Sequence, residues 1–174
     1  MANTYEAVAT VTVGSGGAAD IEFTSIPQTY TDLVVLLSTK TLRAGSPPVT
    51  TIVMTFNAST TNYSSRTLVG DGSSASSNTG STSGINNMQT SAAGNGDSFG
   101  SQYIYIPNYT GTSNNKSVSI DSVMERNATE AYMNLTAGLL SNTAAITSIK
   151  FTEPNGPSDF AQYTTATLYG IKNS

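Results

Sequence analysis

Apolar and polar residues alternate along most of this chain, and that period of two constrains it to β-strands with one face in the core. The alternation predicts nine or ten strands, at residues 5–13, 21–23, 32–40, 50–56, 63–69, 102–106, 116–124, 131–139, 149–151 and 163–171. Glycine- and proline-rich segments separate them, among them residues 14–17, 44–48 and 154–157. The first of these segments, Gly14-Ser15-Gly16-Gly17, lacks the following Lys-Ser/Thr of a phosphate loop and predicts a turn.

Residues 129–140 could form a helix instead of a strand, because they contain Ala, Met and Leu, which favour helices. Their apolar set contains Ala131, Met133, Leu135, Ala137 and Leu139. The unbroken alternation, with Gly138 inside it, favours a strand.

Many short strands at close spacing, in a chain of 174 residues, indicate one domain spanning residues 1–174. We therefore expect an all-β fold, an antiparallel β-sandwich that is jelly-roll-like.

Residues 70–100 do not fit this pattern. They are rich in Ser, Gly and Asn, contain no Lys or Arg, and predict a long loop or arm. Two interpretations are open: a flexible Ser/Gly linker over residues 72–84, or an arm that a neighbouring subunit orders. For the second, we expect Ile85, Met88 and Phe99 to be the buried contacts, and the segment to be mobile in an isolated subunit.

Composition excludes several kinds of chemistry. With no His and no Cys, the chain has no imidazole base, thiol nucleophile or zinc knuckle. A net charge of −4 and scattered cations argue against nucleic-acid binding. We find no apolar run long enough to span a membrane and no signal peptide, so we expect synthesis in a cytoplasm. No cofactor is expected.

Paired carboxylates are the remaining route to catalysis, as in glycoside hydrolysis. Asp71 and Asp97 bracket the segment 70–100, and Glu153 and Asp159 flank a Pro/Gly turn. Each pair is better explained by turn geometry, which Asp favours, and no calcium-loop pattern accompanies them. We therefore expect no catalytic and no metal-binding residues.

Tyrosines are the candidates for contact with a partner, because the ring is apolar and its hydroxyl polar. Tyr63 and Tyr109 lie next to Asn- and Ser-rich turns and are the best placed. With Ile85, Met88 and Phe99 they form the set of partner-binding residues that the sequence predicts.

Five segments carry a resemblance: MANTYEAVATVTV (1–13), IEFTSIP (21–27), NASTTNYSSR (57–66), YIYIPNY (103–109) and TATLYGIKNS (165–174). They resemble a family of small virion proteins of tailed bacteriophages, cyanophages among them, over nearly the whole chain outside residues 70–100. The resemblance implies a structural component of the virion with a β-sandwich fold and no catalytic residues.

Three functions follow from these observations. The favoured one is a capsid decoration, or cement, protein on the outer surface of the head, bound to the major capsid protein or another virion protein. The alternatives are the receptor- or glycan-binding head of a tail or head fibre, which would contact a host surface glycan, and a carbohydrate-active enzyme. The absence of a shaft or coiled-coil region favours decoration over a fibre, and the absence of His weighs against an enzyme. Because so few residues are charged, we also expect a homo-oligomer, specifically a trimer.

Overall fold

The computed structural model describes residues 4–43, 49–92, 98–127, 130–154 and 159–172, and these fold into strands without a helix. The strands are β1 (Tyr5–Thr12), β2 (Asp20–Phe23), β3 (Asp32–Thr41), β4 (Val49–Phe56), β5 (Tyr63–Gly70), β6 (Ala75–Thr79), β7 (Ile85–Ala92), β8 (Gly100–Ile106), β9 (Lys116–Glu125), β10 (Ala131–Leu140), β11 (Ile149–Thr152) and β12 (Thr165–Ile171). The expected all-β class is confirmed, and so is the strand at 131–139.

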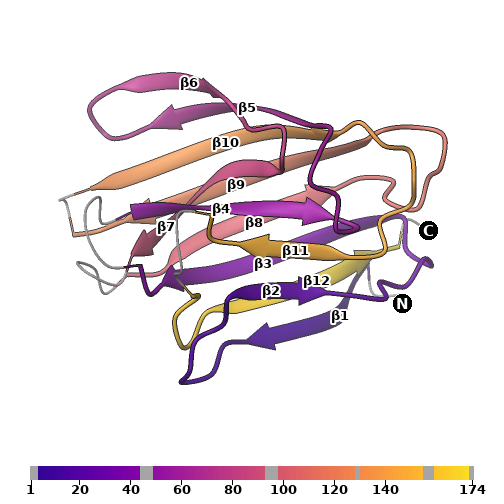
Figure 1. Cartoon of the computed structure of the whole chain (residues 1–174), viewed down its shortest axis with the longest axis horizontal. Helices are drawn as coiled ribbons and strands as arrows, with labels where there is room; N and C mark the ends of the chain where they lie inside the picture. Colours follow the sequence, from indigo (N-terminus) through magenta and orange to yellow (C-terminus); the bar gives the residue numbers. More distant parts are fainter. Residues whose placement is uncertain (1–3, 44–48, 93–97, 128–129, 155–158, 173–174) are drawn as a thin grey trace.

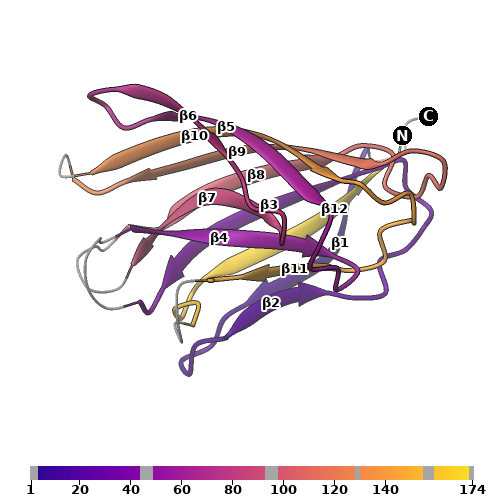
Figure 2. The same cartoon turned by 45° about the horizontal axis from the view of Figure 1, so that its top comes forward.

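The strands form two layers that lie face to face (Figures 1 and 2). A large antiparallel layer has the order β1-β12-β3-β8-β9-β10-β5-β6. A small antiparallel layer has the order β2-β11-β4-β7. One short parallel contact, Lys40 and Thr41 of β3 against Ser91 and Ala92 of β7, joins the two layers at one corner.

The pairing is that of a jelly roll with two inserted hairpins. Eight strands pair from the outside inwards: β1 with β12, β2 with β11, β3 with β8, and β4 with β7. The further pairs β12–β3 and β11–β4 complete two four-stranded sheets. The hairpins β5–β6 and β9–β10 are inserted after β4 and β8, and both extend the large layer beyond β8.

The core between the layers is apolar where the eight jelly-roll strands face each other. Ile52, Met54 and Phe56 alternate inward along β4, and Phe151 joins them from β11. Their partners on the large layer include Val35 of β3. Each of these side chains is fully buried, as the period-two pattern predicted.

A close approach between layers depends on Gly138 in β10. A Cβ atom built there would lie 2.8 Å from Cδ1 of Ile85 in β7. The glycine therefore makes room for the isoleucine, and β7 can lie across β9 and β10.

The structure corrects the loop expected over residues 70–100. That segment contains β6 and β7, so the described residues form twelve strands where nine or ten were expected. In β7, Ile85 and Met88 are three residues apart, yet both are buried, because Asn87 has a positive φ of 70° that breaks the alternation. In β6 all five residues are exposed and the strand is held by pairing with β5.

Candidate functional site

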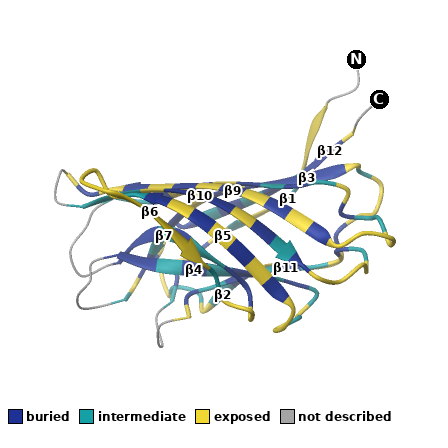
Figure 3. Cartoon of the chain, turned by 90° about the horizontal axis from the view of Figure 1, so that it is seen from above, coloured by how far each residue is buried: buried dark blue, intermediate teal, exposed yellow. Residues whose placement is uncertain are grey.

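The outward side of β3, β8, β9, β10 and β5, which we call the outer face, carries large apolar side chains in contact with solvent. Met133 is 65% exposed, Leu68 58% and Leu135 57%, and three further residues are at least 40% exposed: Leu36, Tyr103 and Val123. Figure 3 shows the alternation of buried and exposed residues along these strands. Single exposed apolar residues are ordinary, but a contiguous set marks an interaction surface.

Strand register brings four of these side chains together. Leu68 of β5 lies directly opposite Leu135 of β10, and Met133 of β10 lies opposite Val123 of β9. Directly opposed side chains have Cβ atoms about 5 Å apart, so these pairs touch. In the row of Leu68 and Leu135, the exposed Asp121 of β9 comes next, followed by Tyr103 of β8 and Leu36 of β3.

The inner side of β5 and β10 is polar around Thr67 and Thr136. The hydroxyls of Thr67 in β5 and Thr136 in β10 are hydrogen-bonded at 2.8 Å, and Asn87 Nδ2 donates to Thr67 Oγ1 at 3.2 Å. Asn134 Nδ2 donates to the backbone oxygen of Asn87 at 2.6 Å. Thr67, Thr136 and Asn134 are all buried. In the middle of β10, therefore, polar residues face inward and apolar residues face solvent, the reverse of the usual arrangement.

The same polar interior continues beneath β7. The backbone N–H of Gln89 donates to Ser122 Oγ at 2.9 Å, and Gln102 Nε2 donates to the backbone oxygen of Gln89 at 2.7 Å. Thr39 Oγ1 donates to Gln102 Oε1 at 3.0 Å and lies 2.9 Å from the hydroxyl of Thr90. These bonds satisfy side chains that would otherwise be costly to bury.

Four tyrosines gather at the other end of the outer face, near β1. The rings of Tyr5 and Tyr169 meet edge to face, with centroids 6.4 Å apart. A hydrogen bond with Tyr5 raises the pKa of Tyr103. Tyr105 donates to Asp32 Oδ2 at 2.9 Å, and this bond raises the pKa of Tyr105. The cluster is thus a partly exposed aromatic platform that internal hydrogen bonds hold in place.

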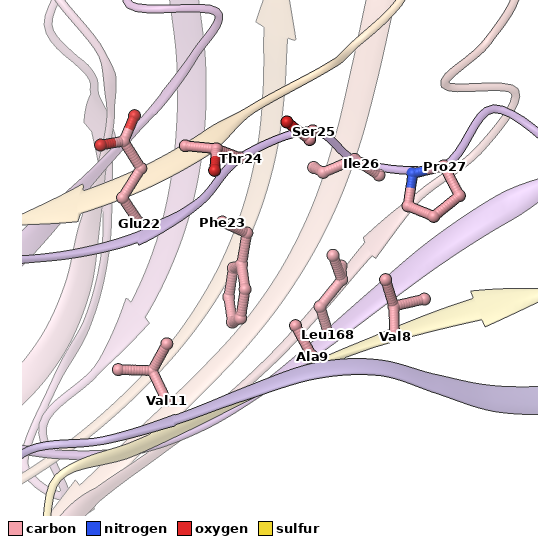
Figure 4. Close-up of a pocket in the computed structure, with 10 residues that line it drawn as sticks. All are labelled: Val8, Ala9, Val11, Glu22, Phe23, Thr24, Ser25, Ile26, Pro27 and Leu168. Carbon is pink, nitrogen blue, oxygen red and sulfur yellow. The ribbon is translucent and has the colours of Figure 1, made fainter.

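An apolar hollow of about 340 Å³ lies where the edge strands β1 and β2 come together. Figure 4 shows Phe23, Val11 and Leu168 pointing into it, while the Glu22 carboxylate points away. Among its lining residues we find no converging set of polar groups, which a specific small-molecule site requires. We interpret it as the incompletely closed edge of the sandwich.

The partner-binding residues predicted from the sequence lie elsewhere than expected. Ile85 and Met88 are buried in the core of their own chain and do not need a neighbour to cover them. Tyr63 is buried against Phe56, whose amide donates to its hydroxyl at 2.7 Å, and burial raises its pKa. Tyr109 is fully buried, its hydroxyl donates to the Pro27 carbonyl, and its pKa is also raised by burial. These four residues therefore cannot serve as surface contacts in this structure.

Phe99, the fifth predicted residue, lies just before β8 and is half-buried. Tyr63 and Tyr109 were misassigned because proximity to a polar turn does not determine which way a side chain points. The alternating apolar set in 131–139 predicts the strand, but the alternation does not show that Met133 and Leu135 lie at the surface.

Carboxylates occupy structural positions. Asp71 accepts hydrogen bonds from the amides of Ser73 and Ser74, at 2.8 and 2.6 Å, and from both hydroxyls, and these bonds hold its pKa well below the usual range. Its expected partner Asp97 lies outside the described residues. Glu153 is buried, accepts a hydrogen bond from Thr50 and lies 3.8 Å from the Arg43 guanidinium.

Within the described ranges no group of three or more acidic side chains could hold a metal ion, and no helix could span a membrane. Comparison with known proteins gives no further indication: no family model matches the chain, and no curated protein matches it.

Proposed function

We propose that this chain is a structural protein of a bacteriophage virion, and that it decorates the outer surface of the head as a cement protein. The proposal joins the resemblance of five sequence segments to the jelly-roll topology. Jelly rolls are common in viral capsid proteins, although the fold by itself does not determine function.

The observation that carries the proposal is the apolar outer face. A chain that works alone in water gains nothing from exposing Met133, Leu135 and Leu68, whereas a protein that assembles on a particle buries such residues. The inserted hairpins that bear them, β5–β6 and β9–β10, are additions to the eight-stranded fold. Their role is therefore association, with the major capsid protein, another virion protein or other copies of the chain.

The proposal includes homo-oligomerisation and location in the virion. The sequence favoured a trimer, and the number of copies stays a prediction. Within the segment 70–100, the described residues 70–92 do not form the expected mobile arm, because β6 and β7 are paired within the chain.

The decisive experiment is to add the purified chain to phage heads that lack it, sediment the particles and locate the bound density by reconstruction. We expect saturable binding at symmetry-related positions on the head surface. Density on a tail or fibre only, or no co-sedimentation, would refute the decoration proposal.

The tyrosine cluster supports one alternative, the receptor- or glycan-binding head of a fibre. Aromatic faces stack on sugar rings, and Tyr5 and Tyr103 are each more than 40% exposed. If this alternative holds, soluble protein competes with phage adsorption to host cells, and Tyr103→Ala weakens that competition without affecting head binding.

We propose binding rather than catalysis. Asp71 is held by four hydrogen bonds within its own turn, which fits a structural carboxylate better than a general acid or nucleophile. Glycan cleavage by the purified chain that is lost on Asp71→Asn or Asp97→Asn would contradict this.

A further inference from the structure

We infer that a second copy of this chain covers the outer face at β5, β10 and β9, with the two β10 strands facing each other across a two-fold axis. This inference rests on the same outer face as the proposed function and names the partner that covers it. The contact between two copies does not depend on where the protein lies on a particle.

The inverted polarity of β10 is the first support. β10 contains no charged residue, and its outward positions Met133, Leu135 and Ala137 form an apolar line between Leu68 on β5 and Val123 on β9. A line of apolar side chains with a further apolar side chain on each neighbouring strand is typical of a sheet face that packs on another sheet. Its own chain does not provide that sheet, because the small layer lies against the inner side.

The size of the face is the second support. The axis along β10 lays β5 over β9 and β6 over β8, so the shared face runs from β6 to β8. A surface five strands wide and about eight residues long measures roughly 24 by 26 Å. Two such faces bury about 1,200 Å² in total, which reaches the lower end of the range for specific protein interfaces.

Charge placement is the third support. Arg66 on β5 and Asp121 on β9 are exposed, lie on opposite sides of β10, and are two residues out of register with each other. Neither belongs to an ion pair among the described residues. A two-fold axis along β10 places β5 of one copy over β9 of the other. Arg66 then comes within about 7 Å, measured along the strand, of the position opposite Asp121, a gap that its long side chain spans.

This arrangement makes the surface self-complementary. The contact forms twice, once on each side of the axis, as an isologous interface requires. A second copy is therefore favoured over an unrelated partner, whose surface would have to supply both the apolar strip and the matching charges.

A charge exchange tests the inference. We compare the full-length wild-type chain with Arg66→Asp, Asp121→Arg and the double variant by sedimentation velocity over micromolar concentrations. We expect a wild-type dimer, a dissociation constant raised about tenfold or more by each single reversal, which opposes like charges, and recovery to near the wild-type value in the double variant. Glu22→Arg, a reversal on the small layer, is the matched control and should leave dimerisation unchanged.

Circular dichroism and thermal unfolding verify that each variant is folded; because the substituted residues are exposed, we expect all four to be. A wild-type monomer or trimer, single reversals without effect, or a double variant no better than the singles would each overturn the inference. A monomer in solution that still decorates heads would refute this interface and leave the proposed function intact. A dimer that responds to the charge exchange as expected but binds no particle would support this interface and refute the proposed function.

Discussion

Strand β4 of the jelly roll and strand β10 of an inserted hairpin use the same alternating pattern in opposite ways. Along β4 the apolar residues Ile52, Met54 and Phe56 point inward and are fully buried. Along β10 the apolar residues Met133 and Leu135 point outward, and the polar residues that alternate with them, Asn134 and Thr136, are buried. Alternation therefore shows that a strand has two unlike faces, but the surrounding strands decide which face is inside.

Hydrogen bonds and close packing in its interior hold the inserted region in this orientation. Thr67, Thr136 and Asn134 have hydrogen-bond partners, and Gly138 admits Ile85 from β7. A slip of one residue in β10 would bury its apolar set, but it would also remove the glycine from beneath Ile85. The chain thus has two apolar faces, and one of them remains for a partner.

The largest effect on stability is expected from a substitution in the core of the eight jelly-roll strands. Phe151→Ala removes a fully buried ring from β11, between β2 and β4, and should lower the free energy of unfolding by about 3–5 kcal/mol. Chemical denaturation measures this. If the loss were below about 1 kcal/mol, these strands would not form the stabilising core that their burial indicates.

The polar interior of the inserted region should respond more weakly and differently. Thr136→Val deprives the Thr67 hydroxyl of a partner and should lower the free energy of unfolding by about 1–2 kcal/mol. Replacing both Thr67 and Thr136 with Val should cost less than the sum of the two single changes, because two apolar groups of similar shape then meet. Strict additivity in this double-mutant cycle would show that the two hydroxyls act independently.

The sequence predicted ten of the twelve strands, and the two that it missed have physical explanations. β7 has its buried Ile85 and Met88 three residues apart, because the positive φ of Asn87 disrupts the period of two. β6 buries no side chain, so its sequence has no hydrophobic pattern that would predict a strand. Backbone pairing with β5 and the Asp71 turn hold it instead.

The candidate site was harder to predict than the fold. Outward and inward apolar sets look alike in a sequence, so Leu135 and Met133 gave no sign of being exposed. Tyr63 and Tyr109, in contrast, looked like surface residues, but their hydroxyls bond to backbone groups of residues 56 and 27 inside the fold. Those partners become visible only when distant segments are brought together.

A smaller and local effect concerns the turn that joins the inserted strands β5 and β6. Hydrogen bonds to the ionised Asp71 hold its pKa below the 3.8 expected in an unfolded chain. The folded turn therefore binds fewer protons than the unfolded one, so its stabilisation is present above pH 3.8 and is lost as the pH falls through the folded pKa. In an NMR titration, the amide signals of Ser73 and Ser74 should shift with a midpoint well below 3.8. Asp71→Asn should abolish that shift and increase amide exchange in β6 but not in β4, and a midpoint near 3.8 would contradict the turn geometry.

The smallest effect on folding is expected at the outer face. Leu135→Thr keeps a residue that suits a strand and replaces an apolar side chain that is already 57% exposed. The free energy of unfolding of the monomer should change by no more than about 0.5 kcal/mol. Self-association should weaken by about tenfold or more, because a two-fold contact loses the leucine from both copies.

Leu42→Thr is the matched control, since Leu42 is 47% exposed but lies beyond the end of β3, outside the strip along β10. Equal effects of the two substitutions on association would mean that general hydrophobicity drives it. A large loss of monomer stability in Leu135→Thr would mean that β10 depends on its outer side chains to fold. Only the combination of an unchanged monomer and a weakened assembly fits a hairpin whose apolar side is reserved for another copy of the chain.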